Sequence, residues 1–202
     1  MESEAMGRRP GGRTARTREA VHQACVRLLA THGALGFGIE DVAVEAGVHK
    51  TTVYRRWRSI ADLLGEVARD LIDQDVPIPD EGTVAADLHA IGHTIANLIR
   101  HRVHGAAMTA LFTAPATMTD VDEAIRTFWA RRLDQLSPVV ERAAARGELP
   151  EGTDPAQLFE SLGAPLYYRL LITRQPIDDD AVERAVAVTL AAARSGLFLA
   201  TG

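Results

Sequence analysis

The chain has one cysteine, Cys25, among 202 residues, which excludes an internal disulfide and fits a reducing compartment. No apolar run approaches the roughly 18 residues of a membrane-spanning helix. The N-terminal stretch MESEAMGRRPGGRTARTR lacks the apolar centre of a secretion signal. These absences predict a cytoplasmic protein with no membrane partner, in which Cys25 is inert core packing.

Catalytic signatures are also missing, since the sequence contains no nucleophile elbow, no phosphate-binding loop and no complete set of metal ligands. His89 and His93 lie four residues apart on a predicted helix and could share a metal ion. No cysteine or paired acid completes the set at close spacing, and two imidazoles alone make a weak site. Histidines of a polar face or a pocket are favoured, so we expect no enzyme, no metal site and no cofactor.

The charge is unevenly distributed along the chain. Residues 1–60 hold ten Lys and Arg against six Asp and Glu, whereas residues 61–202 hold twelve against twenty-one, giving +4 and −9. A basic front on an acidic body suits a protein that binds nucleic acid. Chance clustering beside a disordered basic tail explains the charge equally well.

Glycine and proline divide the sequence into helical blocks, and no stretch alternates long enough to require a strand. Helices are predicted over residues 14–32, 39–46, 50–57, 60–73, 83–101, 104–113, 120–146, 155–174 and 179–196. Pro138 and Pro165 lie inside two of these blocks and are expected to kink or split them. The break QDVPIPDEG places a domain boundary near residues 74–82. We therefore expect an all-α fold with three parts: a disordered basic arm (1–13), a small domain (14–73) and a larger helical domain (74–202).

The stretch DVAVEAGVHKTTVYRRW fits a helix-turn-helix, in which Gly47 permits the tight turn between two short helices. Val53 and Trp57 are four residues apart and face inward. The second helix of such a unit enters the DNA major groove. Its outward residues are candidate DNA contacts: Lys50, Thr51 and Thr52 for base edges, and Tyr54, Arg55, Arg56 and Arg58 for phosphates. The competing interpretation is a solvated polar helix.

Thr17 to Leu64 resembles the DNA-binding domain of the TetR family of transcriptional regulators. It has, in order, a first helix that ends in glycine, an I/V-A-x-x-A-G-V helix, a T-x-Y-x-x-F/W recognition helix and a leucine-bearing fourth helix. The sequence departs from the family at Ile60, where lysine is usual, and at Gly38, where serine or threonine is usual. Both departures remove candidate phosphate contacts.

The resemblance implies a homodimeric repressor that binds a palindromic operator and is released by a small-molecule effector. The larger domain would then carry the ligand pocket and the dimer interface. Apolar walls with a few polar groups are typical of such a pocket, although aromatics at helical spacing also form cores. The candidate ligand contacts are Met108, Phe112, Phe128, Trp129, Arg132 and Phe159.

The last two predicted helices carry apolar stripes that suit a two-fold four-helix interface. The candidate interface residues are Leu162, Leu166, Leu170, Val182, Val186 and Leu190. The leading hypothesis is therefore a repressor that binds double-stranded DNA and is released by a small apolar or amphipathic ligand. The alternatives are an enzyme, and a small-molecule-binding or interaction module that has lost DNA binding.

Overall fold

The computed structural model describes residues 12–72, 78–115 and 117–199, and these ranges are helical throughout apart from turns, loops and one β-bridge between Thr153 and Leu199. The predicted all-α fold is confirmed. The elements are α1 (Gly12–His32), α2 (Ile39–Glu45), α3 (Lys50–Tyr54), α4 (Ile60–Ile72), α5 (Val84–Arg100), α6 (Arg102–Phe112), α7 (Thr119–Ala145), α8 (Pro155–Tyr168), the π-helical turn η1 (Arg169–Thr173) and α9 (Asp179–Arg194). Within these ranges no helix is long and apolar enough to cross a membrane.

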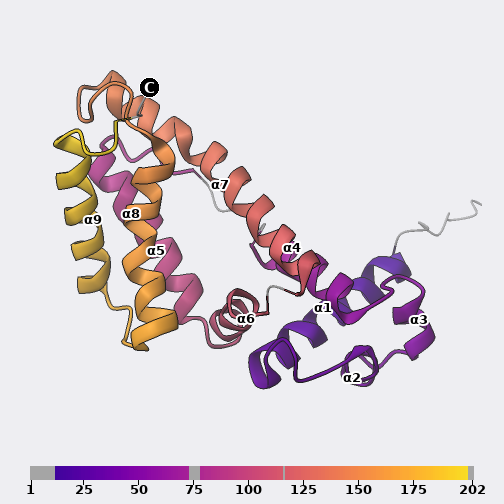
Figure 1. Ribbon diagram of the computed structural model, residues 1–202. Helices are drawn as coiled ribbons and strands as arrows, with labels where there is room; N and C mark the ends of the chain where they lie inside the picture. Colours follow the sequence, from indigo (N-terminus) through magenta and orange to yellow (C-terminus); the bar gives the residue numbers. More distant parts are fainter. Residues whose placement is uncertain (1–11, 73–77, 116, 200–202) are drawn as a thin grey trace, which may run out of the picture.

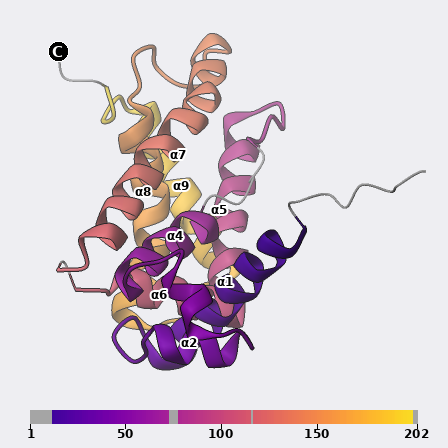
Figure 2. The same cartoon turned by 90° about the vertical axis from the view of Figure 1, so that its right-hand side faces the viewer.

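The helices form two hydrophobic cores joined by α7. The first core contains α1 to α4 together with α6 and the start of α7, and the second contains α5, the end of α7, α8 and α9. Figures 1 and 2 show α7 as a long diagonal that begins beside α4 and ends at the far end of the bundle of α5, α8 and α9. The small N-terminal unit therefore completes its core with helices from the larger part of the chain.

The structure does not describe all of the residues at the expected boundaries between the three parts of the chain. Residues 1–11 of the expected arm and residues 73–77 at the expected boundary lie outside the described residues. Helix α1 begins at Gly12, two residues before its predicted start. The division into parts ending at residues 13 and 73 thus stays a prediction.

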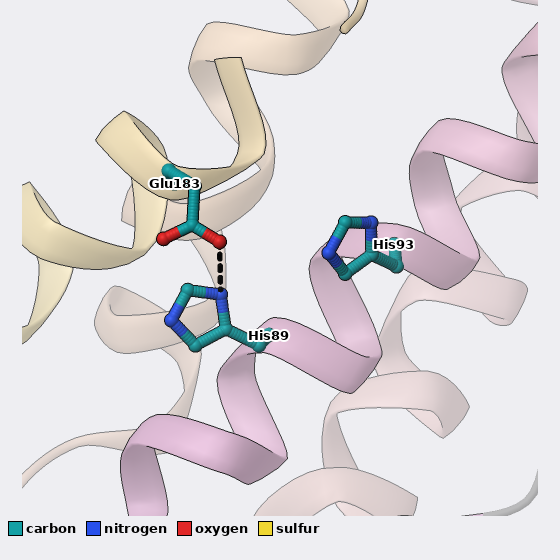
Figure 3. A group of neighbouring side chains, drawn as sticks. All are labelled: His89, His93 and Glu183. Carbon is teal, nitrogen blue, oxygen red and sulfur yellow. Dashed lines mark ion pairs between the residues drawn. The ribbon is translucent and has the colours of Figure 1, made fainter. Parts of the chain in front are cut away.

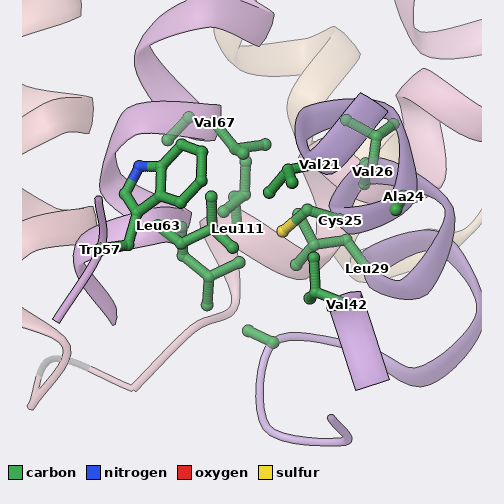
Figure 4. Close-up of a cluster of buried hydrophobic side chains, with 14 of the residues drawn as sticks. Val21, Ala24, Cys25, Val26, Leu29, Val42, Trp57, Leu63, Val67 and Leu111 are labelled. Carbon is green, nitrogen blue, oxygen red and sulfur yellow. The ribbon is translucent and has the colours of Figure 1, made fainter. Parts of the chain in front are cut away.

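The first core is built on the apolar stripe predicted for α1 (Figure 4). Val21, Cys25 and Leu29 are buried on this stripe and meet Val42 of α2 and Leu63 of α4. Burial raises the pKa of the Cys25 thiol to about 12, so it stays protonated and unreactive at neutral pH. The expectation that Cys25 packs in the core holds.

Helix α7 runs through Pro138 without a break, so of the two expected effects, a kink or a split, the split does not occur. Proline has no N–H to donate to the carbonyl four residues earlier, which is that of Asp134. The Ser137 hydroxyl donates to the Asp134 carbonyl instead, at 2.9 Å. Helix α8 likewise contains Pro165 and continues to Tyr168, after which the π-helical turn η1 ends at Arg174 with a left-handed φ of 52°.

Close packing between distant helices depends on two glycines. A Cβ atom at Gly65 of α4 would lie 3.1 Å from the Asp120 carbonyl oxygen of α7, so α4 and α7 pack backbone to backbone. A Cβ atom at Gly92 of α5 would lie 2.7 Å from Val182 Cγ1 of α9. These contacts set the spacing of the helices that surround both functional regions described below.

Candidate functional site

The turn between α2 and α3 is fixed by backbone hydrogen bonds. Gly47 has a φ of 65°, the left-handed conformation that favours glycine. The Gly47 N–H donates to Val44 O at 3.1 Å, and the Val48 N–H donates to Ala43 O at 3.0 Å, which is the Schellman pattern of helix ends. His49 then caps the start of α3, and its Nδ1 accepts a hydrogen bond from the Thr51 N–H. The crossing of α2 and α3 is therefore set locally by the sequence.

Helix α3 places its apolar residues inward and its polar residues outward. Val53 and Trp57 are 0% and 2% exposed, as their spacing predicts. Lys50 and Thr51 are exposed and Thr52 is half-buried. The α-helix ends at Tyr54, earlier than the predicted residue 57, so the exposed residues Tyr54, Arg55, Arg56 and Arg58 lie at its last turn and in the turn that follows.

Glu66 of α4 fixes the position of Trp57, the residue that follows the last turn of α3. Its carboxylate accepts the Trp57 indole N–H at 2.7 Å and Arg18 Nε of α1 at 2.6 Å. Burial opposes ionisation of Glu66, but the hydrogen bonds from Arg18 and Trp57 outweigh it and lower its pKa to about 2. His22 is 5% exposed, and its Nε2 atom lies 3.3 Å from Oε1 of the same carboxylate. One charged group therefore ties α1, α4 and the residue after α3 together.

Two of the predicted phosphate contacts already have carboxylate partners within the chain. The Tyr54 hydroxyl donates to Glu40 at 2.9 Å, which raises the pKa of Tyr54. Arg56 lies 3.4 Å from Glu66 and places its guanidinium 5.2 Å from the centre of the Trp57 ring. Among the described residues, no such partner holds the side chains of Lys50, Arg55 and Arg58, which project freely.

The two departures from the family pattern have structural explanations. Gly38 has no side chain to cap α2, and instead its own N–H donates to the Asp41 carboxylate at 2.8 Å. Ile60 is half-buried and packs against the first core, where a lysine would have kept its ammonium group in solvent. The loss of polar groups at these positions leaves the fold intact.

The larger bundle contains a partly open cavity of about 730 Å³ that is lined mainly by α5, α7 and α8. Five of the six predicted ligand contacts line it: Met108, Phe128, Trp129, Arg132 and Phe159. Phe112 is outside the lining and packs edge-on against Tyr167, with the ring centres 5.6 Å apart. The sequence prediction missed one wall, formed by Ile91, Thr94, Ile95 and Leu98 of α5. Their spacing along α5 is a helical stripe that a search for aromatics alone does not find.

The polar residues on the cavity wall fall into two sets: Thr94, Arg132 and Tyr167 are half-buried, and Arg131, Gln135 and Glu160 are exposed. Burial raises the pKa of Tyr167 to about 12, an effect that neighbouring Arg132 partly offsets. Burial also lowers the pKa of Arg132, which still stays protonated at neutral pH. Trp129 packs edge-on against Tyr167, with their ring centres 5.7 Å apart. The arrangement is a largely apolar chamber whose wall also carries Arg131, Arg132 and Glu160, which suits an amphipathic molecule.

The residues predicted for the dimer interface face the interior of their own chain instead of its surface. Leu162, Leu166, Val182 and Val186 are at most 1% exposed, Leu190 is 9% exposed and Leu170 is half-buried, because all six pack against the second core of their own chain. The period of an apolar stripe does not distinguish an internal core from an external contact. The exposed apolar side chains of these elements are instead Pro165, Tyr168, Ile172 and Val188. Pro165 and Val188 line one shallow groove between α8 and α9.

A helix-turn-helix joined to a helical bundle with a cavity is the architecture of a class of two-domain transcriptional regulators. Residues 23–67 match the family model described as bacterial regulatory proteins, tetR family, and residues 78–189 match the tetracyclin repressor-like C-terminal domain. The chain belongs to the TetR family of transcriptional regulators.

Known proteins of this family resemble the chain over most of its length. The HTH-type transcriptional regulator AqdR of Rhodococcus erythropolis is 30% identical over 189 residues, which cover 94% of this chain and 91% of AqdR. The solved structure of the TetR family transcription regulator SCO0332 is also 30% identical, with a TM-score of 0.63 over 87% of this chain and 97% of that one. A complex of SmeT with triclosan shares the fold at 21% identity, with a TM-score of 0.66 over 92% of this chain and 96% of SmeT.

Replacing Glu66 by glutamine tests its role in joining Trp57, after α3, to α1 and α4. We expect Glu66→Gln to lower the free energy of unfolding by about 1–3 kcal/mol, because the Arg18 and Trp57 donors lose a charged acceptor. The folded pKa of about 2 lies below the ordinary 4.5, so this stabilisation is fully present above the ordinary value and is lost as the pH falls through 2. Urea unfolding between about pH 5 and pH 2 should therefore show a shallower pH dependence in the variant. Glu141→Gln, at an exposed position of α7, is the matched control; equal slopes for all three proteins would contradict this role.

Proposed function

We propose that this protein is a ligand-responsive repressor that binds a palindromic operator as a homodimer in the cytoplasm. The observation that carries the proposal is the exposure of Lys50 and Thr51 on α3, whose opposite side is buried, and of Arg55 just after it. A small apolar or amphipathic ligand in the cavity would release the DNA.

Base recognition would come from the first turn of α3. Lys50 is exposed and carries donors for guanine O6 and N7, and the threonines offer hydroxyl and methyl groups to base edges. Arg55 and Arg58 lie just beyond the helix, where the flanking phosphates would run. The preformed turn at Gly47 means that little of the binding energy is spent on ordering this unit.

Two substitutions separate base readout from phosphate binding. We expect Lys50→Ala to cost about 1–3 kcal/mol at the operator base that it contacts and to relax sequence preference there. Arg55→Ala should weaken binding to all DNA sequences alike, and it should lower the slope of log affinity against log salt concentration by about 1. Mobility-shift titrations on a fragment from upstream of the chain's own gene would measure both.

The matched control for these substitutions is Arg194→Ala, at an exposed position near the end of α9. Its affinity and salt slope should equal those of the unchanged protein. If Lys50→Ala and Arg55→Ala also leave specific binding unchanged, α3 is not the reading helix. A chain without any specific binding would instead be a small-molecule-binding module.

A continuous set of contacts links the cavity to the recognition helix. Helix α7 carries Phe128 and Trp129 at the cavity and packs at Asp120 against Gly65 of α4. The next residue of α4, Glu66, accepts the indole N–H of Trp57 after α3. A ligand that favours a shifted position of α7 would thereby move α4 and the recognition helix, and its differential affinity for the two arrangements would set the extent of release.

Filling the cavity tests whether it holds the ligand. Gly163 lines the cavity, and a Cβ atom there makes an ordinary contact with the Tyr167 ring at 3.5 Å, so Gly163→Leu places its added volume at the cavity wall. The amphipathic fluorophore anilinonaphthalene sulfonate should bind the unchanged protein and lose most of its fluorescence in this variant. Ala145→Leu, at an exposed site near the end of α7, should behave as the unchanged protein. Equal fluorescence in all three would place the binding site elsewhere.

Dimerisation would use the exposed apolar residues of α8, η1 and α9. Tyr168 is 57% exposed, Ile172 is 66% and Val188 is 65%. Apolar side chains of this size that gather on adjacent elements mark a contact surface. Two copies related by a two-fold axis would pair these elements into a four-helix arrangement. The two recognition helices would then face two half-sites.

A charge placed in this surface should separate the protomers. We expect Val188→Asp to convert the protein from a dimer to a monomer at micromolar concentration, as measured by light scattering, because each interface would bury two unpaired carboxylates. Leu35→Asp, at a residue that is 70% exposed in the loop after α1, should remain dimeric. A dimer that withstands Val188→Asp would require a different interface.

A further inference from the structure

Helices α5 and α9 bring together a set of side chains whose chemistry is unrelated to DNA or to an amphipathic ligand. His89 and His93 lie one turn apart on α5, and Glu183 faces them from α9 (Figure 3). One ligand atom of each residue lies within 4.8 Å of the other two. We propose that these three residues bind a divalent transition-metal ion of the zinc class.

The ligand types match that class of ion. Imidazole nitrogen suits Zn²⁺, Ni²⁺ and Cu²⁺, and a set of two histidines with one glutamate leaves a coordination position open for water. Metal-to-ligand distances of roughly 2.0–2.2 Å place neighbouring ligand atoms about 3.3–3.5 Å apart in a tetrahedral site. His89 Nδ1 and Glu183 Oε1 are already 3.2 Å apart. His93 offers a ring nitrogen within 4.8 Å of the other two ligand atoms, so it would have to move closer to complete the set.

The backbone holds the two helices at the distance that this geometry needs. Gly92 precedes His93, and Val182 precedes Glu183, and the two helices touch at these residues. The contact is so close that a Cβ atom at Gly92 would lie 2.7 Å from Val182 Cγ1. A bulkier residue at Gly92 would separate the histidines from the carboxylate.

A second carboxylate reinforces the arrangement without joining the proposed ligands. Asp179 lies one turn before Glu183 and is 3.8 Å from His93 Nδ1. Arg100 Nη2 donates to Asp179 at 2.8 Å, and Arg100 Nε donates to the Ile177 carbonyl at 2.6 Å, so this end of α9 is anchored to α5. Asp179 thus lies beside the His93 ring, beyond hydrogen-bond distance, and adds a negative charge close to the proposed site.

Solvent access allows the ion to enter. The side chains of His89, His93 and Glu183 are 33%, 40% and 60% exposed. The bound ion would bridge α5, which forms one wall of the cavity, to α9. Metal binding and cavity shape would therefore be linked, although the metal site itself does not depend on the proposed function.

Metal titration of the untagged full-length protein, first stripped with EDTA, tests the proposal. We expect one Co²⁺ per chain, seen as visible absorption typical of low coordination number, and displacement of Co²⁺ by Zn²⁺. His93→Ala and Glu183→Gln should each weaken binding by at least the roughly tenfold that even an outer partner contributes. Zn²⁺ should raise the melting temperature of the unchanged protein and not that of the variants.

The matched control is His104→Gln, at the other close pair of histidines, where the His101 and His104 rings are 4.3 Å apart. This variant should keep the stoichiometry and affinity of the unchanged protein. Melting without metal should agree within about 2–4 °C for all variants, which shows that each one is folded. The proposal is overturned if the unchanged protein binds no Co²⁺ or Zn²⁺, or if His93→Ala and Glu183→Gln bind with undiminished affinity.

Discussion

The hydrogen bond between the Trp57 indole and the Glu66 carboxylate is the contact on which the arrangement of this protein depends. A five-residue helix such as α3 has too few internal hydrogen bonds to hold its own direction. Val53 and Trp57 anchor one side of it in the core, and Glu66 fixes its end to α4. Because Arg18 donates to the same carboxylate, α1 is joined to the same point.

Helix α7 joins the two hydrophobic cores of the protein. It belongs to both hydrophobic cores, and it continues through Pro138 because Ser137 supplies the hydrogen bond that proline cannot. A rigid element shared by two cores transmits displacement better than a flexible linker, because packed side chains resist compression. The Gly65 contact packs α4 directly against α7, so a continuous set of contacts runs from the cavity to the helix-turn-helix.

Local patterns in the sequence predicted the parts of this structure that local interactions determine. The spacing of Val53 and Trp57, the turn at Gly47 and the stripe on α1 all rest on neighbours within a few turns. Contacts between distant residues escaped prediction. Glu66 is 48 residues from Arg18, and nothing in the sequence pairs Glu183 with His89. The stripes of α8 and α9 were identified, but periodicity could not say that Leu162 and Val186 face inward.

The pairing of Arg56 with Glu66 has a consequence for how the protein responds to its surroundings. Each phosphate that a cation neutralises displaces close to one condensed counterion from DNA, and this displacement makes protein–DNA affinity sensitive to ionic conditions. In the proposed DNA complex, Arg56 would arrive already paired with Glu66, so Lys50, Arg55 and Arg58 would contribute most of the displacement. The affinity of the proposed complex would therefore depend less on salt concentration than the number of basic residues around α3 suggests.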